Sequence, residues 1–140
     1  MTKGRFDLLV EPLSDLLGTA EKIPSGEEGF EAFMEETVEP CIAHFAASCP
    51  DDMTRKTLHN KLLMQTRSDL AVVRAHAIMA LKACFDQVGE DYLFLVPETL
   101  PFMAELLEDS DGRVERLAHE LKKQVEDLSG EGLDTYLVGE

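Results

Sequence analysis

The sequence predicts an all-α protein, folded as an α-solenoid of about three antiparallel helical hairpins. The first reason is the helical spacing of apolar residues in the second half of the chain. These residues form one stripe of Leu100, Met103, Leu106 and Leu107, and another of Val114, Leu117, Ala118, Leu121, Val125 and Leu128. An acidic turn around Asp109 separates the two stripes. Each stripe needs an apolar surface to cover it, so we expect a hairpin of two helices.

The second reason is an internal repeat. A shift of 41 residues places Val114 on Val73, Ala118 on Ala77, Leu121 on Ala80, Val125 on Cys84, and Gly130-Glu131 on Gly89-Glu90. A period near 40 residues built from paired helices is typical of repeats that bury their apolar faces only by stacking on a neighbour. The core is therefore expected between hairpins as well as within them.

The segment from Pro97 to Leu121 resembles a HEAT repeat. Pro97 opens the first helix, Asp109 lies in the turn, and the stretch from Val114 to Ala118 opens the second helix. This resemblance implies a HEAT-like α-solenoid.

The resemblance is incomplete in one respect. A usual HEAT repeat has Asp in the turn and Val-Arg five residues later, and these residues form a ladder along the stack. Here Asp109 is followed by Val114-Glu115, whereas the earlier copy has Val73-Arg74 preceded by Ser68. Each copy therefore keeps one half of the Asp–Arg ladder.

The stretch from Leu95 to Leu137 is similar to the C-terminal end of the family called HEAT repeat-containing protein 1 or U3 small nucleolar RNA-associated protein 10. The similarity covers about residues 60 to 138. The resemblance implies that residues 1–140 are a single HEAT-like domain and the C-terminal fragment of a much larger scaffold. It also implies a non-enzymatic interaction module of the small-subunit processome, active in the nucleolus in pre-rRNA transcription and processing. The implied partners are processome proteins and, in the assembled particle, pre-rRNA or snoRNA.

The composition fits a packed helical domain. A chain of 140 residues with 44% apolar residues can bury a core of useful size. The net charge of −15 argues against a generic surface for nucleic acid or anionic membrane, since attraction to phosphate requires the opposite sign. The sequence has no apolar signal region and no apolar run long enough to span a bilayer. We therefore predict no membrane partner.

The three cysteines, Cys41, Cys49 and Cys84, are an odd number without the spacing of a secreted disulfide scaffold. We expect free, buried thiols and a reducing compartment, and no disulfide.

The N-terminal part predicts a helix over residues 5–17, with Pro12 inside it and Gly18 as a C-cap. An apolar helix so near the N-terminus suggests a chain cut from something longer, because the end of a solenoid normally shows a polar face. Residues 18–29 are the best linker, and Ser25 with Glu28 predicts a capping box for the next helix.

Residues 27–49 are expected to form a helix that bends at Pro40, because proline removes one backbone donor. One side of this helix is apolar. The other side carries the acidic residues Glu27, Glu28, Glu31, Glu35, Glu36 and Glu39. A solvated face explains these acids most simply.

Three further helices are expected. One runs from Pro50-Asp51-Asp52 to about Thr66, and the next spans residues 69–88. The second of these is apolar on more than one side around Ala77 and Leu81, so it should be packed on several sides and form the hub of the fold. The helix over residues 110–129 has a single apolar stripe and charged residues elsewhere, which is typical of a terminal cap.

Four Cys and His residues could either bind a metal or serve a structural role. Cys41 and His44, with Cys49 and His59, resemble a set of zinc ligands. However, Cys41 and His44 lie within an amphipathic helix, whereas structural zinc ligands usually come in tight pairs from loops or turns. We therefore predict no metal and no cofactor.

Catalysis has no candidate group in the sequence. Cys84 lies on the buried stripe, which disfavours a reactive thiolate. The Gly26-x-x-Gly29 segment lacks the Lys-Ser/Thr of a phosphate-binding loop. His76 and His119 are expected on helix surfaces, since the sequence places no carboxylate partner beside either. The chain is therefore predicted to be no enzyme and to have no small-molecule substrate.

A partner-binding site is predicted where the charge becomes locally basic. Residues 53–82 contain six Lys or Arg residues and one acid, whereas residues 83–112 contain eight acids and no Lys or Arg. The candidate partner-binding residues are Lys61, Arg67, Arg74 and Lys82. The competing explanation is that these cations neutralise neighbouring acidic helices for little energy.

Two alternatives remain open at this stage. One is a HEAT-repeat adaptor of another class, such as a transport or phosphatase scaffold. The other is a cryptic hydrolase that uses Cys or Asp residues.

Overall fold

The structure, a computed structural model, describes residues 2–15 and 31–134. Its helices are α1 (Lys3–Asp15), α3 (Glu39–Ala47), α4 (Asp52–Gln65), α5 (Ala71–Val88), α6 (Val96–Leu107) and α7 (Gly112–Ser129). A π-helical turn, η3 (Met34–Val38), leads into α3, and a 3-10 segment, η4 (Gly89–Leu95), leads into α6. No strand forms within these described ranges, so the all-α prediction is confirmed.

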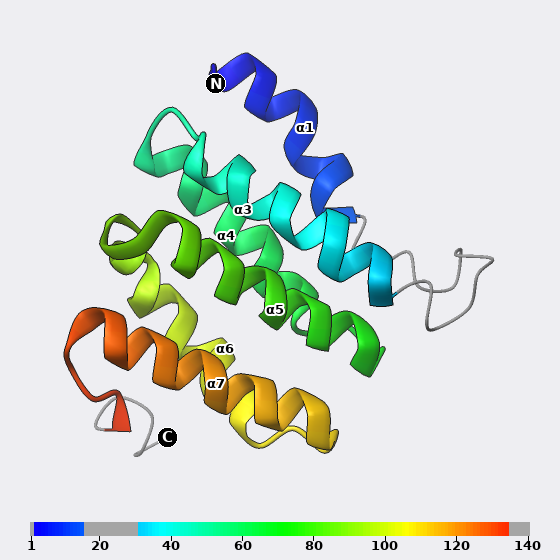
Figure 1. The fold of residues 1–140 in the computed structure, drawn as a ribbon, viewed down its shortest axis with the longest axis vertical. Coiled ribbons are helices and arrows are strands. Elements are labelled where there is room, and N and C mark those ends of the chain that lie inside the picture. The colour runs from blue at the N-terminus through cyan, green and yellow to red at the C-terminus, as the bar shows by residue number, and fades with distance from the viewer. Residues whose placement is uncertain (1, 16–30, 135–140) are drawn as a thin grey trace.

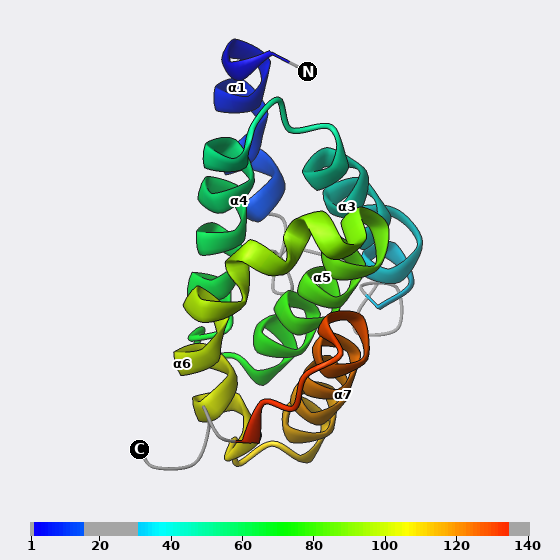
Figure 2. The ribbon, with the colours of Figure 1, turned by 90° about the vertical axis from the view of Figure 1, so that its left-hand side faces the viewer.

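The helices stack in chain order from one end of the molecule to the other (Figure 1). Seen from the side, α4 and α6 form one layer, while α3, α5 and α7 form the other (Figure 2). The helix α5 packs against α4 within its hairpin and against α3 and α7 on its two sides, and α6 packs against α7. Two hairpins are therefore α4 with α5 and α6 with α7. We count α1 and α3 as the first hairpin of the HEAT-like solenoid, since α1 packs on α4, α3 packs on α5, and the rings of Phe6 and Phe45 stack between them.

The internal repeat is confirmed by burial and by backbone conformation. The paired apolar positions are all buried, namely Val73, Ala77, Ala80 and Cys84 in α5, and Val114, Ala118, Leu121 and Val125 in α7. The paired glycines, Gly89 and Gly130, both have positive φ, at 74° and 77°. A side chain would strain this conformation, which explains why glycine ends both helices.

The hub of the core is α5, as predicted. Leu81, Cys84 and Phe85 of α5 are fully buried. Phe85 stands edge-on to the ring of Tyr92 in η4, at a centroid distance of 4.9 Å. At the other end of the stack, the rings of Phe6 in α1 and Phe45 in α3 lie stacked at 5.3 Å. The apolar contacts therefore run through all three hairpins.

His59 in α4 makes polar contacts with both η4 and α6 inside the core. Its Nδ1 lies 3.0 Å from the hydroxyl of Tyr92, and its Nε2 lies 2.6 Å from the hydroxyl of Thr99 in α6. Burial lowers the pKa of His59 to about 3, so the ring is neutral. A neutral ring with two hydroxyl partners satisfies its buried nitrogens without introducing a charge.

Pro40 changes the winding of the helix that leads into α3. The backbone N–H of Glu39 donates to the carbonyl of Met34, five residues earlier, which defines the π-helical turn. Proline has no backbone N–H, so Pro40 cannot restore the ordinary pattern. The irregularity expected at Pro40 therefore takes the form of a π-helical turn just before it.

Several boundary predictions can be compared directly with the structure. Asp51 caps α4, since its side chain accepts a hydrogen bond from the backbone N–H of Thr54. The hydroxyl of Thr54 in turn accepts from the backbone N–H of Asp51. The helix α1 continues through Pro12. The predicted cap at Gly18, the linker over residues 18–29, and the Ser25–Glu28 capping box lie outside the described residues. The 3-10 segment η4 was not predicted.

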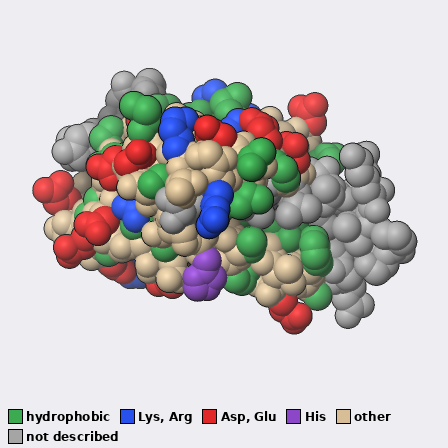
Figure 3. Space-filling model, turned by 90° about the horizontal axis from the view of Figure 1, so that it is seen from above, with side chains coloured by type: hydrophobic (Ala, Val, Ile, Leu, Met, Phe, Trp, Pro, Cys, Tyr) green, Lys and Arg blue, Asp and Glu red, His purple; other side chains and the backbone are tan. Residues whose placement is uncertain are grey.

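The α1 end of the stack leaves apolar side chains at the surface, as the view onto that end shows (Figure 3). Leu8 and Leu9 of α1 are 76% and 46% exposed. By contrast, α7 buries a single apolar stripe and turns charged residues outward, as predicted. The two ends of the described stack therefore differ in polarity.

Candidate interaction surface

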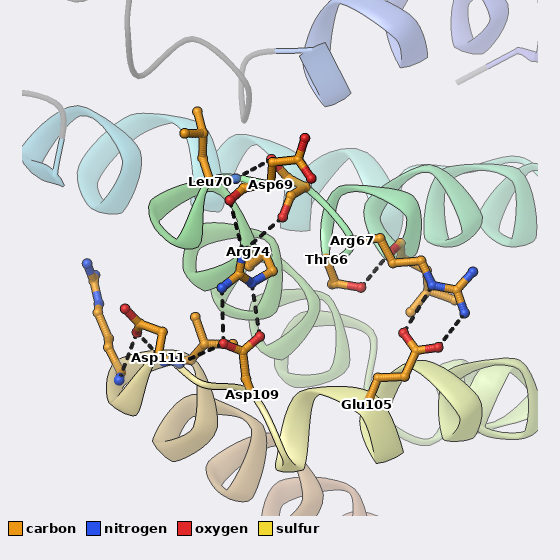
Figure 4. Close-up of polar contacts among 12 residues, drawn as sticks. Thr66, Arg67, Asp69, Leu70, Arg74, Glu105, Asp109 and Asp111 are labelled. Carbon is orange, nitrogen blue, oxygen red and sulfur yellow. Dashed lines mark hydrogen bonds and ion pairs between the residues drawn. The ribbon is translucent and has the colours of Figure 1, made fainter.

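Arg74 of α5 and Asp109, in the turn after α6, form a bidentate ion pair. The Nε of Arg74 lies 2.9 Å from Oδ2 of Asp109, and its Nη2 lies 3.0 Å from Oδ1. The remaining nitrogen of Arg74 donates to the carbonyls of Ser68 and Asp69, at 3.0 and 3.3 Å. Figure 4 shows the guanidinium between the turn that precedes α5 and the turn that follows α6. The pair therefore joins the second hairpin to the third.

The turn before α7 fixes Asp109 in place. The backbone N–H of Asp111 donates to Oδ1 of Asp109 at 2.9 Å, and the carboxylate of Asp111 in turn caps the first backbone N–H groups of α7. Burial alone would raise the pKa of Asp109, but the hydrogen bonds from Arg74 and Asp111 lower it overall. The two half-motifs that the sequence shows in separate copies thus meet as one complete rung between hairpins.

Arg67, in the turn that follows α4, makes a second bridge to the third hairpin. Its Nη2 and Nε lie 2.9 and 3.1 Å from the carboxylate oxygens of Glu105 in α6. Its guanidinium also lies 4.0 Å from the ring centroid of Phe102. The side chains of Arg67 and Glu105 are 45% and 56% exposed, so this ion pair contributes little to stability.

The other two predicted partner-binding residues also bridge between hairpins. Lys61 of α4 pairs with Glu11 of α1, and Lys82 of α5 pairs with Glu120 of α7, the latter at 2.9 Å. All four candidates therefore contact an acid on a neighbouring hairpin. Partner binding by Lys61, Arg67, Arg74 and Lys82 stays a prediction.

The structure contains a buried cluster of charged side chains around His76 that the sequence did not predict. His76 of α5 is fully buried, with Nδ1 2.8 Å from Oε1 of Glu39 and Nε2 3.1 Å from Oε1 of Glu31. Arg113 of α7 clamps the same Glu31 through two nitrogens, at 2.7 and 2.8 Å. The cluster ties the helix that contains η3 and α3 to both α5 and α7.

Two predictions are wrong at this cluster. His76 was expected on a helix surface without a carboxylate partner, but it lies in the core between two carboxylates; His119 is exposed, as predicted. Glu31 and Glu39 were expected on a solvated face, but they turn toward α5, and Glu39 is only 7% exposed. The two carboxylates that face His76 come from the first hairpin, whereas His76 lies in the second. Residue spacing within one segment cannot reveal such a contact.

The electrostatics of the cluster favour a set of charged groups. The hydrogen bond from Arg113 lowers the pKa of Glu31 to about 2, against the opposing effect of burial. Burial alone would lower the pKa of His76, but its contacts with Glu39 and Glu31 raise it overall. The two carboxylates therefore favour the protonated form of His76, which links the helix that contains η3 and α3 to α5.

The cysteines are free, and two of them are buried as predicted. Cys49 and Cys84 are buried, and burial raises the pKa of the Cys84 thiol to about 12. Such a thiol is unreactive at neutral pH. Cys41 is exposed, contrary to prediction, because it lies on the outward side of α3. In the described part of the chain, no three His, Cys, Asp or Glu residues are placed to hold a metal ion.

Comparison with known proteins gives a consistent set of relatives. The chain is 36% identical over 136 residues to HEAT repeat-containing protein 1 of Danio rerio, and 35% identical over 136 residues to the protein of that name in Homo sapiens. It is 35% identical over 135 residues to U3 small nucleolar RNA-associated protein 10 of Phaeosphaeria nodorum. These matches cover 97%, 97% and 96% of this chain, but only 6%, 6% and 7% of the relatives.

No family model matches the chain. Among the described helices, none is long and apolar enough to cross a bilayer.

Proposed function

The chain belongs to the family of HEAT repeat-containing protein 1 and U3 small nucleolar RNA-associated protein 10, and from this we propose that it is a non-enzymatic scaffold segment in ribosome biogenesis. Its assembly in this proposal is the small-subunit processome, and its compartment is the nucleolus. The observation that carries the proposal is the similarity over nearly the whole chain to proteins whose name associates them with U3 small nucleolar RNA.

The architecture supports a scaffold role. Three hairpins are held in register by an apolar core and by ion pairs between them, such as Arg74 with Asp109 and Arg113 with Glu31. Stacked hairpins of this kind provide extended surfaces for other proteins. The scaffold is thus a rigid set of helix faces rather than a cleft built around one substrate.

We further propose that residues 1–140 form one domain at the C-terminal end of a much larger scaffold. The chain spans about 6% of the length of the curated relatives it matches. The exposed Leu8 and Leu9 offer an apolar face against which a preceding hairpin would pack, whereas α7 is polar outside its buried stripe. This polarity supports a C-terminal position.

The proposed partners are proteins of the processome, with pre-rRNA or snoRNA as a further contact in the assembled particle. The four basic candidates are already paired with acids, and the net charge is −15. Protein contacts are therefore favoured over direct contact with RNA. The names of the relatives also favour this assembly over a transport or phosphatase adaptor.

Affinity purification from nuclear extract tests the proposal. The tagged chain is expected to enrich processome proteins together with U3 small nucleolar RNA, measured by mass spectrometry and by RNA quantification after nuclease treatment of a parallel sample. Enrichment of transport or phosphatase subunits without processome proteins would contradict it.

The same assay tests the basic candidates with a matched control. Arg67→Glu with Lys82→Glu changes two inter-hairpin cations, whereas Lys3→Glu with Lys123→Glu changes two cations in local, exposed pairs. Arg74 is left intact, since Arg74→Glu would place a carboxylate against Asp109. Selective loss of partners in the first variant would support a role for the basic residues in partner binding. Equal recovery by both folded variants would leave these cations a structural role only.

A further inference from the structure

A largely apolar pocket lies where the segment that follows α7 turns back toward η4 and α6. Its volume is about 480 Å³, which is enough to take up apolar side chains. Its walls include Leu93 in η4, Val96, Pro97 and Leu100 in α6, and Glu131 and Leu133 after α7. Leu93, Val96 and Leu100 pack against the core but are only partly buried. Their remaining apolar surface would be stabilised by an apolar side chain that covers it.

The segment after α7 is held against this pocket by specific contacts. Gly130 ends α7 in the left-handed conformation, which lets the chain reverse its direction. The backbone N–H of Leu133 donates to Oε2 of Glu126 at 2.7 Å, and Nζ of Lys122 lies 2.6 Å from Oδ1 of Asp134. Figure 2 shows this segment, in red, turning back from α7 toward α6. Leu133 is only 4% exposed, so the residues after Asp134 start from the rim of the pocket.

The sequence after Asp134 supplies an apolar side chain at a suitable position. It reads Thr135-Tyr136-Leu137-Val138, and Leu137 is four positions after Leu133. Residues four positions apart share one side both in an extended strand and in an α-helix. Leu137 is therefore expected on the side of Leu133 in either conformation, whereas Val138 is expected on the opposite side. Four residues can span up to about 14 Å, and the pocket begins at Leu133 itself.

We propose that the side chain of Leu137 docks in this pocket, so that the chain covers its own apolar groove between α6 and the end of α7. Burial of a leucine side chain is favourable, and the loop that must close after Leu133 is short. An occupant from the same chain also loses no translational freedom, unlike one from another molecule. The filled groove is closed to a partner helix and to a second copy of the chain.

Disulfide trapping in the 140-residue chain tests this docking directly. Leu137→Cys is combined with Leu100→Cys, and Cys41→Ser removes the exposed native thiol. Oxidised glutathione is the oxidant, and the bridge is measured by mass spectrometry of the digested monomer. The matched control carries Val138→Cys in place of Leu137→Cys. A bridge requires Cα atoms about 4.4–6.8 Å apart, so the Leu137 variant should form it at least about fivefold faster than the control.

Binding of Nile red, an uncharged apolar dye, gives an independent measurement on chains without a bridge. Leu137→Asn should raise the dye fluorescence at least about twofold, because it uncovers the pocket, and should lower the Tm by about 3–6 °C, because buried apolar area is lost. Val138→Asn introduces the same side chain one position later. It should change the Tm by less than about 1 °C and leave the dye fluorescence near that of the parent chain.

The outcomes separate the possible occupants of the pocket. Equal bridging by the two cysteine variants, or equal dye binding by the two asparagine variants, would overturn the inference. Bridges between two chains, with dye binding that falls as the protein concentration rises, would assign the pocket to a second copy instead. Dye binding by the parent chain as strong as that of Leu137→Asn would show that the pocket is open to an outside partner. These tests do not depend on the proposed assembly, since no processome component takes part.

Discussion

Asp109→Asn is expected to weaken the joint between the second and third hairpins. The side chains of Arg74 and Asp109 are only 16% and 11% exposed, and two charge-assisted hydrogen bonds connect them. A bond to a charged group contributes about 1.5–3 kcal/mol, and loss of one partner of a fully buried pair costs about 3–5 kcal/mol. Asparagine keeps one acceptor oxygen, so the free energy of unfolding should fall by about 2–3 kcal/mol.

Urea unfolding measured by circular dichroism checks this value against a matched control. Glu105→Gln removes a charge from a bidentate pair of similar geometry, but that pair is about half exposed. It should cost less than about 1 kcal/mol. If the two variants differed by less than about 0.5 kcal/mol, the partly buried rung would contribute no more than a surface ion pair, and the reasoning would be refuted.

The same rung has a predictable dependence on pH. The pKa of Asp109 in the folded state lies below its ordinary value of 3.8. Its stabilising effect is therefore present above the unfolded pKa and is lost as the pH falls through the folded pKa. Asp109→Asn should consequently lose less stability than the parent below about pH 4. A parallel decline in both chains would contradict this expectation.

Three other changes have expected outcomes. Leu81→Ala should lower the free energy of unfolding by about 2–5 kcal/mol, because Leu81 is fully buried. Met64 is exposed, so Met64→Ala should lower it by less than about 0.5 kcal/mol. Nearly equal values for the two variants would exclude α5 as the hub. The pKa of His76 is raised above 6.5, so its stabilisation is complete below that pH and is lost as the pH rises through the folded value. His76→Gln should flatten this loss in unfolding experiments at increasing pH, and an unchanged slope would argue against a charged His76. Gly130 has a φ of 77°, so Gly130→Ala should lower the free energy of unfolding by about 1–2 kcal/mol in thermal unfolding. Gly112→Ala should not lower it, because Gly112 does not have a positive φ. Equal effects of the two substitutions would show that backbone conformation is not the cause.

The parts of the fold that the sequence predicted are those that depend on local periodicity. The helices α5 and α7 were predicted within a few residues because their apolar positions repeat at helical spacing and again after 41 residues. Gly89 and Gly130 end both helices for the same conformational reason. A stacked repeat shows its core positions twice, so one copy supports the interpretation of the other.

The polar contacts could not be predicted in the same way. Arg74 and Asp109 are 35 residues apart, and His76 and Glu39 are 37 residues apart. Such pairs form only once the hairpins have stacked, and helical spacing within one segment carries no information about them. The only sequence signal for the Arg74–Asp109 pair was the motif split between the two copies of the repeat. One copy keeps the Arg and the other keeps the Asp, so the two residues can pair between neighbouring hairpins.

The π-helical turn at η3 illustrates a second limit. Pro40 correctly indicated an irregular helix, but the loss of one donor can lead to a kink, a break or a change of winding. The structure shows the change of winding, and Glu39, which follows this turn, contacts the buried His76. The residues around Pro40 could not reveal this contact, because His76 lies in α5.

Charge pairing also explains why the basic segment was an incomplete guide to partner binding. The cations of residues 53–82 lie beside acidic helices, and the stacked fold uses Lys61, Arg67 and Lys82 for inter-hairpin pairs. A cation held in this way must give up a partner before it can bind another, whereas a carboxylate without a partner has no such cost. With Asp and Glu outnumbering Lys and Arg by 28 to 13, unpaired charge on this chain is mostly negative. Electrostatic recognition of a partner by this chain should therefore depend mainly on its unpaired acids rather than on its paired cations.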